Sequence, residues 1–383
     1  MFKRSLLFTL ISALTVTASF FAGYFTHARF TPSQPLPVLH QAYDILLKNA
    51  YQVPEPGSKL EYGMIRGMLQ AYGDPFSSFS EPPQAELTSN TLQGSFGGIG
   101  ATIEKDPQGF YVLFPIKDSP AAKAGILDGD RLIQVDQLAI LSETPIEDIL
   151  AAVRGPVGTR VKIVVLRLPD ETEYTFEIKR EEIALPSVTW RLDLSEPRLG
   201  LIKVNVIASS TPDEIITAAA ELSELGATAF VLDLRDNFGG LLDSGIDVAR
   251  LFLKEGLVIQ QQYRDKPVES FRVTKAGELA DLPIVILINQ NTASAAEIVA
   301  GALQGQKRAQ LIGTPTYGKN TIQLVFELQD KSSLSVTAAQ WWVPNLEIIK
   351  PGQGLQPDIL LTETSGNPDP ALQAAIQVFF SKP

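Results

Sequence analysis

The second half of the chain alternates strand-like and helix-like segments, and this alternation most constrains the fold. Beyond Pro186, apolar strand-like runs such as "LGLIKVNVI", "TAFVLDLR" and "LPIVILIN" are separated by helix-like runs such as "TPDEIITAAAELSELG" and "LLDSGIDVARLFL". Successive strand–helix–strand units need crossover helices and mostly parallel strand pairing. Strands that are apolar along their whole length, such as "FVLDL" and "IVILI", suit a sheet covered on both faces. The sequence therefore predicts a mixed α/β domain over residues 184–383.

The middle of the chain predicts a separate, smaller module over residues 89–183. Short strand-like segments with tight glycine turns, such as "GGIGATIEK" and "GFYVLFPI", are followed by two short capped helices and two alternating strands. In the second of these helices, Thr144 and Glu147 have the spacing of a capping box. A module of about ninety residues is long enough to enclose one compact core.

The N-terminal residues 1–30 predict an export signal or a membrane anchor. Lys3 and Arg4 precede an almost uncharged apolar run from Leu6 to Tyr24, and the small residue Ala28 follows it. This order is typical of secretory signals, and the run is also near the lower length of a spanning helix. Both alternatives place the rest of the chain outside the cytoplasm, in a periplasm or a lumen. An uncleaved segment would hold it at the inner membrane. Residues 31–88 predict a helical segment.

Composition removes several kinds of chemistry. The net charge of −11 disfavours a nucleic-acid partner held through its phosphates. The chain has no cysteine, and its two histidines, His27 and His40, both lie near its start. We therefore expect no thiolate nucleophile, no histidine base, no metal and no cofactor.

Ser294 is the first candidate catalytic residue, because it follows a buried strand and begins the helix-like run "SAAEIVAGALQG". In open α/β sheets, active sites gather at the carboxyl ends of strands. The same segment also fits a capping box with Glu297, in which Ser294 would only satisfy helix amides. If Ser294 is a nucleophile, Lys319 in the loop "TPTYGKNTIQ" can be its base, provided that burial lowers the lysine pKa. Gln323 would then orient the lysine amine without adding charge.

The loop "LRDNFGG" supplies the second part of the candidate site. Gly239 and Gly240 let backbone amides approach a reacting carbonyl closely. Together with the amide of Ala295, they would form an oxyanion hole. The alternative is that both glycines only turn the chain between a strand and a helix.

The order and spacing of eight stretches resemble the carboxy-terminal processing peptidases, also called tail-specific proteases, over roughly residues 35–380. These stretches are "IRGMLQAYGDPFSSF", "GSFGGIGATIE", "SPAAKAGILDGDRLIQVD", "VRGPVGTRVKIVVLR", "VLDLRDNFGGLLDSGIDVARLFL", "TASAAEIVAGALQ", "RAQLIGTPTYGK" and "GLQPDI". In that family, a serine three residues before a helix glutamate is the nucleophile, which corresponds to Ser294. The family's base and supporting glutamine correspond to Lys319 and Gln323. The resemblance also implies a ClpP/crotonase-like catalytic core with an inserted PDZ domain.

The same resemblance implies a peptide-binding site in the PDZ domain. Its carboxylate loop would be "FGGIG", and the helix from Pro145 to Arg154 would line the groove. PDZ domains bind a peptide as an added strand and hold its terminal carboxylate with backbone amides. The implied partners are therefore the C-terminal tails of proteins or peptides. The residues of the implied loop are Phe96, Gly97, Gly98, Ile99 and Gly100.

The chain departs from the family pattern at four positions. Gly305 stands where the family often has an aspartate, and Ala296, Asn320 and Phe76 replace a common serine, glycine and histidine. Gly305 would end its helix well, but it removes any charge support for the site. None of these changes removes Ser294 or Lys319.

The resemblance implies an exported serine endopeptidase that cleaves near the C-termini of proteins through a Ser–Lys dyad. The PDZ domain would select or gate the substrate tail, and the sequence is compatible with an oligomer. One alternative is a catalytically inactive PDZ scaffold, of which Gly305 would be a sign. Another is an acyl-thioester hydratase or hydrolase, which the PDZ module and the Ser–Lys spacing disfavour.

Overall fold

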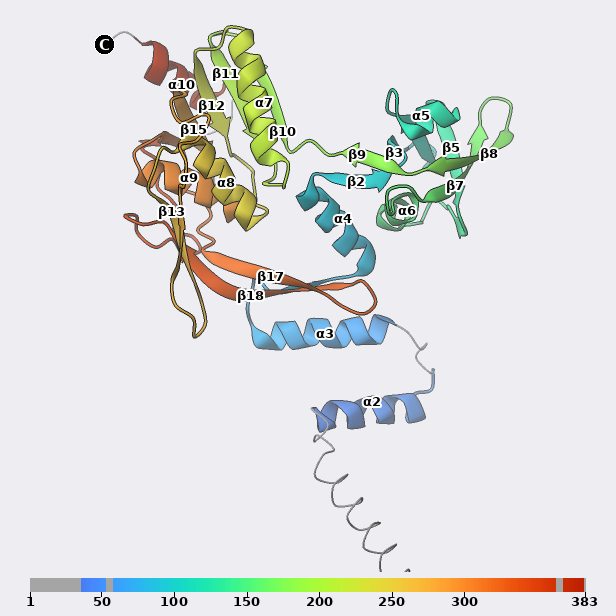
Figure 1. The fold of residues 1–383 in the computed structure, drawn as a ribbon. Coiled ribbons are helices and arrows are strands. Elements are labelled where there is room, and N and C mark those ends of the chain that lie inside the picture. The colour runs from blue at the N-terminus through green and yellow to red at the C-terminus, as the bar shows by residue number, and fades with distance from the viewer. Residues whose placement is uncertain (1–35, 53–57, 363–367, 382–383) are drawn as a thin grey trace, which may run out of the picture. The chain divides into compact units, whose positions relative to one another are not determined.

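A computed structural model describes residues 36–52, 58–362 and 368–381 (Figure 1). The chain divides into two compact units, Met1–Met64 and Ile65–Pro383. The first contains α2 (Pro37–Asn49), which buries none of its side chains, and the start of α3 (Ser58–Tyr72). The predicted export segment lies outside the described residues. Within the described part of the chain, no helix combines the length and the apolar character needed to span a membrane.

A six-stranded sheet forms the centre of the catalytic half of the second unit, in the order β10-β11-β12-β15-β16-β19. Only the β10–β11 pair is antiparallel. The strands are β10 (Val188–Leu192), β11 (Leu199–Val204), β12 (Ala229–Asp233), β15 (Ile284–Ile288), β16 (Gln310–Gly313) and β19 (Ile359–Leu360). The helices are α7 (Thr211–Glu224), α8 (Leu242–Phe252), α9 (Ala295–Gly305) and α10 (Pro370–Phe380). The predicted mixed α/β class with mostly parallel pairing is confirmed.

This sheet is covered on both faces, as its apolar strands predict. Phe230 and Leu232 of β12 pack with α7, α8 and α9, whereas Ala229 and Val231 of the same strand pack with α10. Figure 1 shows the same layers. Every residue of β12 and of β15 is buried, so neither strand needs a polar face.

Small residues bring α8 and α9 close together beside Ser294. A Cβ at Gly245 of α8 would lie only 3.1 Å from the Cβ of Ala295, the first residue of α9. The side chains of α9 are buried from Ala295 to Leu303. This close packing fixes the start of the helix that Ser294 precedes.

An antiparallel second sheet contains the segment after Lys319. Its strands are β1 (Ser78–Ser80), β13 (Leu257–Tyr263), β14 (Glu269–Arg272), β17 (Thr321–Glu327) and β18 (Ser333–Trp342). One edge of β18 pairs with β1 and β13, and its other edge pairs with β17. Among the described strands, β17 pairs with β18 alone.

The smaller module follows α4 (Pro82–Gln93) and has its own core. Its elements are β2 (Ser95–Gly98), β3 (Ala101–Lys105), β4 (Tyr111–Pro115), α5 (Pro120–Ala124), β5 (Asp130–Val135), β6 (Leu138–Ala139), α6 (Ile146–Val153), β7 (Arg160–Arg167), β8 (Thr172–Lys179) and β9 (Glu181–Ala184). The main sheet has the order β3-β4-β5-β7-β8, with β6 on β5, and β2 pairs with β9. Ile99, Leu113, Ile149 and Ile163 are fully buried in this core.

The start of α6 differs from the prediction. The helix begins at Ile146 with Pro145 as its N-cap and ends at Val153, one residue inside the expected bounds at each end. Thr144 therefore lies two residues before the helix, where its hydroxyl accepts the N–H of Leu141 at 3.0 Å. The capping box predicted for Thr144 and Glu147 is wrong, because the preceding turn takes the threonine hydroxyl.

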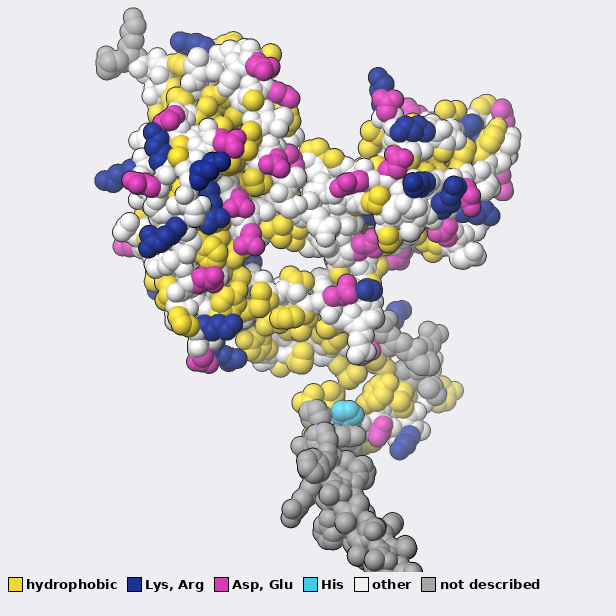
Figure 2. Space-filling model, in the orientation of Figure 1, with side chains coloured by type: hydrophobic (Ala, Val, Ile, Leu, Met, Phe, Trp, Pro, Cys, Tyr) yellow, Lys and Arg dark blue, Asp and Glu magenta, His cyan; other side chains and the backbone are white. Residues whose placement is uncertain are grey.

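Basic and acidic side chains are interspersed on the face of the molecule that Figure 2 shows. The chain as a whole has 32 basic and 43 acidic residues, which gives the net charge of −11.

Candidate active site

Ser294 lies between β15 and α9, at the carboxyl end of the parallel sheet. Its backbone has φ 54° and ψ −121°, a conformation that residues with a side chain rarely adopt. Two bonds join its loop to the loop that follows β12. Thr292 Oγ1 donates to the carbonyl of Leu234 at 2.8 Å, and the N–H of Ala293 donates to the carbonyl of Asn237 at 2.9 Å. The bonds of Thr292 and Ala293 thus stabilise the strained backbone of Ser294.

The buried carboxylate of Glu297 connects the segments of Ser294 and Lys319. Its Oε2 accepts the backbone N–H of Ser294 at 2.9 Å and that of Lys319 at 2.8 Å. Its Oε1 accepts the Thr316 hydroxyl at 2.6 Å and the Gly318 N–H at 2.7 Å. Burial raises the pKa of Glu297, and these hydrogen bonds oppose that rise. Glu297 does more than cap a helix, because it ties together two loops that are far apart in sequence.

The Lys319 side chain is partly buried, and the carboxylates of Glu297 and Asp74 act on it electrostatically. Burial lowers the pKa of Lys319 because it disfavours the ammonium form, while the carboxylates of Glu297 and Asp74 oppose that shift. The Nζ lies 5.2 Å from the centre of the Phe76 ring. Within the described residues, no hydrogen bond joins Lys319 Nζ to Ser294 Oγ. The structure brings the backbones of the two candidate residues together, and their side chains are not hydrogen-bonded.

Gln323 has hydroxyl partners in this structure. Its Nε2 donates to Thr321 Oγ1 at 2.9 Å and to Thr337 Oγ1 at 3.1 Å. The N–H of Thr337 donates to Ser77 Oγ at 3.1 Å, and Ser77 Oγ in turn donates to Asp74 Oδ2 at 2.5 Å. Gln323 therefore belongs to a polar chain that reaches the neighbourhood of Lys319, and its bond to the lysine amine stays a prediction.

The candidate oxyanion loop lies directly against Ser294. A Cβ at Gly239, where φ is 103°, would lie 2.8 Å from the carbonyl oxygen of Ala293 and 2.9 Å from the Cβ of Ser294. Only glycine fits this approach. The Gly239 N–H donates to Asn237 Oδ1 at 2.8 Å, so in this structure it already has an acceptor.

Gly240 has a different backbone environment from Gly239. Its φ is 151°, and a Cβ there would lie 2.0 Å from the carbonyl oxygen of Ile207. Ile207 bonds to the two neighbours of Gly240 in the chain. Its N–H donates to the carbonyl of Gly239, and its carbonyl accepts the N–H of Leu241. Ala295 is 1% exposed, and its amide is in the first turn of α9, where helix amides lack intrahelical partners.

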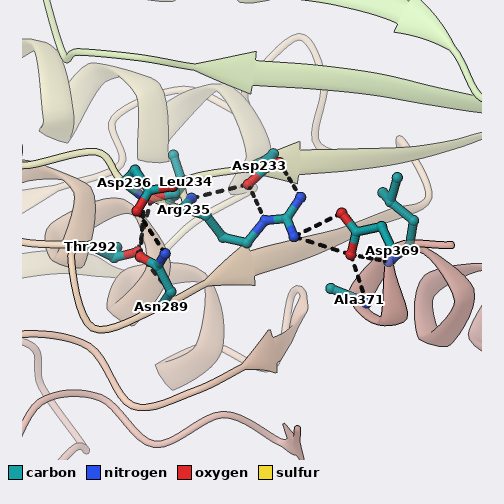
Figure 3. A network of polar contacts seen from close by, with 9 residues as sticks. Asp233, Leu234, Arg235, Asp236, Asn289, Thr292, Asp369 and Ala371 are labelled. Atoms are coloured by element: carbon teal, nitrogen blue, oxygen red, sulfur yellow. Dashed lines mark hydrogen bonds and ion pairs between the residues drawn. The ribbon is translucent and has the colours of Figure 1, made fainter. Parts of the chain in front are cut away.

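An ion-pair network fixes the start of the oxyanion loop (Figure 3). The guanidinium of Arg235 donates to both carboxylate oxygens of Asp233, at 2.9 and 2.7 Å, and forms an ion pair with Asp369 at 2.9 Å. Asp369 is also the N-cap of α10, because its Oδ1 accepts the N–H of Ala371 at 2.9 Å. Burial alone would lower the pKa of Arg235, but the two carboxylates outweigh that effect and raise it.

Asp236 forms a second contact between the loops (Figure 3). Asn289 Nδ2 and Asn291 Nδ2 each donate to Asp236 Oδ1 at 2.9 Å, and these bonds lower the pKa of Asp236. The residues Arg235, Asp236, Asp369 and Asn289 are not among those that the sequence predicted for the site. A usable signal was present for Asp236 and Asn289, since each follows the end of a fully buried strand.

Of the predicted peptide-binding loop, Phe96, Gly97 and Gly98 lie in strand β2, which pairs with β9, and only Ile99 and Gly100 lie in the turn after it. Gly100 has φ 69° and its carbonyl accepts the Ile116 N–H at 2.9 Å. Ile99 is 1% exposed, so its side chain belongs to the core of the module. The Phe96 ring stacks against the guanidinium of Arg154, 4.1 Å from the ring centre. Gly97 accepts the Gly155 N–H, and Gly98 pairs with Glu181.

Gly305 is the last residue of α9, and a left-handed residue, Lys307, follows two positions later. A Cβ at 305 would lie 3.2 Å from Val343 Cγ1 and 3.4 Å from Leu346 Cγ. The position therefore faces apolar side chains, and its glycine permits close packing there. The helix ends at Gly305, as expected, and the left-handed residue beyond its end is Lys307.

Comparisons with known proteins agree with this organisation. Residues 198–361 match Peptidase family S41, and residues 112–167 match the PDZ domain. The chain is 34% identical over 350 residues to a carboxyl-terminal-processing protease of Synechocystis sp., covering 88% of this chain and 81% of that protein. It is also 34% identical over 322 residues to the carboxy-terminal processing protease CtpA of Bacillus subtilis, covering 84% and 68%.

Among solved structures, the photosystem II D1 C-terminal processing protease is 29% identical, with a TM-score of 0.45 and coverage of 84% of this chain and 86% of that one. The predicted combination of a peptidase core and a PDZ domain is confirmed by the two domain matches. The chain belongs to peptidase family S41 and is a serine-type C-terminal processing protease.

Proposed function

We propose that Ser294 and Lys319 form the catalytic dyad of this protease. The observation that carries the proposal is the Glu297 carboxylate, whose Oε2 accepts the backbone N–H groups of both residues. A buried acceptor shared in this way holds the loop of Ser294 and the loop of Lys319 at a fixed position relative to each other. The lowered pKa of Lys319 supports its role, since only the neutral amine can accept a proton.

In the proposed reaction, neutral Lys319 takes the proton of the Ser294 hydroxyl as Oγ attacks the scissile carbonyl. The amide of Ala295 and a glycine amide of the 239–240 pair donate to the oxyanion. The Lys319 ammonium then protonates the leaving amine, which releases the C-terminal fragment. Lys319 next accepts a proton from the water that hydrolyses the acyl-enzyme and returns it to Ser294. Because the Gly239 N–H is bonded to Asn237, its participation requires that this bond open.

Two alanine variants test the dyad. Ser294→Ala and Lys319→Ala are each expected to abolish cleavage of a protein substrate while thermal unfolding stays cooperative. Turnover retained in either variant contradicts the assignment. Labelling of wild-type Ser294 by a fluorophosphonate, together with cleavage, separates the protease from an inactive scaffold. Binding of coenzyme A would favour the acyl-thioester alternative.

We further propose that the PDZ domain admits substrate tails. The support is that β3, which follows the glycine loop, is an end strand of its sheet and, among the described strands, pairs with β4 alone, which leaves an edge for an added strand. A peptide with a free C-terminal carboxylate should compete with substrate, and the same peptide with a C-terminal amide should not. Equal competition by both peptides would contradict a carboxylate-binding role for residues 96–100.

We also propose that the protease works outside the cytoplasm. The support is the sequence of residues 1–30, with Lys3 and Arg4 before an apolar run. Cell fractionation should find the protein in an extracytoplasmic compartment. N-terminal sequencing of that protein distinguishes a cleaved signal from an anchor at the inner membrane.

A further inference from the structure

The strand β17 has an open edge that begins close to the candidate base. The first residue of β17, Thr321, is two positions after Lys319. Among the described strands, β17 pairs with β18 alone. An open edge presents unpaired backbone groups to any extended chain that comes near it. Here that edge starts at the reaction site and leads away from it.

The hydrogen-bond pattern of the hairpin identifies the groups that face outward. The N–H of Leu328 donates to the carbonyl of Ser332 at 2.8 Å at the hairpin end. Hydrogen-bonded pairs alternate along an antiparallel ladder, so Phe326 and Leu324 also bond to β18. The backbone groups of the residues between them then face away from β18. These residues are Gln323, Val325 and Glu327.

An independent contact supports this alternation. Thr337 is the β18 partner of Gln323, and its N–H donates to Ser77 Oγ on the opposite side of β18. Thr337 therefore does not use its N–H to bond β17, as expected for a pair that is not hydrogen-bonded. The outward direction of the Gln323 backbone follows from the same pairing.

Three consecutive side chains along the edge are apolar and exposed. Val325 is 65% exposed, Phe326 51% and Leu324 38%. Three consecutive exposed apolar residues on an open edge strand are a combination that soluble proteins usually avoid. They favour an extended peptide with apolar side chains as the occupant.

We propose that the β17 edge binds the extended substrate as an added strand and delivers its scissile bond to Ser294. This inference rests on the proposed catalytic role of Ser294 and Lys319. Continuity favours substrate over a second copy of the chain, since Gln323 lies four residues after Lys319 and its backbone belongs to the edge. The strand has seven residues, and because strand and peptide both rise about 3.3 Å per residue, it can pair with a peptide segment of about seven residues.

Hydrogen exchange provides the direct test. The full-length Ser294→Ala protein is mixed with a synthetic apolar peptide that the wild-type protein cleaves. We expect the amides of Val325 and Glu327 to exchange at least about tenfold more slowly when peptide is bound. The amides of Leu324 and Phe326 are the internal control, because the β18 ladder already protects them. Peptide binding without protection of Val325 and Glu327 overturns the proposal. Protection that depends only on protein concentration also overturns it, because a second copy would then occupy the edge.

A proline variant tests the same edge by kinetics. Val325→Pro removes an outward N–H and leaves the ladder to β18 intact, which is the setting in which edge strands tolerate proline. We expect KM for the peptide to rise about tenfold with little change in kcat. The matched control is Val268→Pro, at an exposed valine between β13 and β14, which should leave KM unchanged. Thermal unfolding checks that both variants fold.

Separate results would contradict the β17 site and the Ser294–Lys319 dyad. Equal KM for Val325→Pro and the wild type overturns the β17 site and leaves the dyad standing. Full cleavage by Lys319→Ala overturns the dyad, and in that case the exchange of the Val325 amide still reports where peptide binds.

Discussion

Glu297 and Lys319 are joined by a hydrogen bond of 2.8 Å from the lysine backbone N–H to Oε2 of the buried carboxylate. The same oxygen accepts the N–H of Ser294 at 2.9 Å. The distance between the two candidate catalytic backbones therefore depends in part on one side chain, which bonds to the backbone N–H groups of both residues. In this arrangement Glu297 is a positioning residue.

Replacing Glu297 by glutamine tests this role. An amide group offers one acceptor oxygen in place of two, so two of the four donors that face Glu297 would lose their partner. We expect Glu297→Gln to lower the free energy of unfolding by about 2–5 kcal/mol and to reduce kcat of the molecules that remain folded. The measurement combines denaturant unfolding with turnover per folded molecule.

Glu214→Gln is the control for that experiment. Glu214 Oε2 also accepts two backbone N–H groups, those of Ser187 and Val188, but away from the dyad. Because one amide oxygen can still accept both, we expect a loss of about 1 kcal/mol or less and an unchanged kcat. Equal effects of the two substitutions on kcat would contradict a positioning role for Glu297.

The aromatic ring of Phe76 should influence the pH at which the protease becomes active. Only neutral Lys319 accepts a proton, so kcat/KM should rise with pH through the Lys319 pKa, below the ordinary lysine value of about 10.4. A ring beside Nζ stabilises the ammonium and holds the pKa up by a cation–π interaction. Phe76→Leu removes this stabilisation, and the acid limb should move down by about 0.4–1.5 pH units.

Phe76→Tyr keeps an aromatic face and should leave the limb in place. The pH profile of kcat/KM with one peptide substrate measures all three proteins. A limb that does not move in Phe76→Leu, or that moves to higher pH, would show that the ring does not act on Lys319.

The sheet and the position of Ser294 could be predicted because their signals are local. Continuous apolar runs predicted β12 and β15 as strands buried on both faces, and Ser294 lies in the loop that follows the second of them. Local competition caused the error at Thr144, since the turn from Leu141 takes the hydroxyl that a capping box would need. Sequence spacing alone does not show which of two nearby backbone N–H groups will bond to the Thr144 hydroxyl.

The contacts that could not be predicted join residues far apart in sequence. Arg235 and Asp369 are separated by 134 positions, and neither has a periodic pattern that marks it as a partner of the other. The partners of Gln323 show the same limit, because Thr337 reaches it only through the pairing of β17 with β18. Such contacts follow from the register of the sheets, which a single sequence does not specify.

The close approach of Gly239 to Ser294 should make this glycine indispensable for catalysis. In Gly239→Ala, the new methyl group would meet Ala293 O and Ser294 Cβ within 3 Å, so the loop must move away from the nucleophile. Loss of an oxyanion donor lowers kcat by about 100- to 1,000-fold, and we expect a loss in that range. Peptide cleavage under saturating substrate is the measurement.

Gly226→Ala is a matched control, because Gly226 has nearly the same φ, 100°, and nothing within 4 Å of its added Cβ. Both substitutions carry the backbone cost of a left-handed residue, about 1–2 kcal/mol. Only Gly239→Ala should lose activity. If both variants kept full kcat, the loop would not supply an oxyanion donor.

The ion pair between Arg235 and Asp369 should stabilise the protein by attaching α10 to the loop before the candidate oxyanion glycines. Asp369→Asn keeps an oxygen that can cap α10 and removes the charge that Arg235 pairs with. Because the side chains of Arg235 and Asp369 are 13% and 23% exposed, we expect the free energy of unfolding to fall by about 1–2 kcal/mol. Arg160 and Glu177 form an exposed ion pair, and Glu177→Gln should change the free energy of unfolding by only about 0.5 kcal/mol or less. Urea unfolding of the two variants under one buffer gives the comparison, and equal losses would mean that burial adds nothing to the Arg235–Asp369 pair.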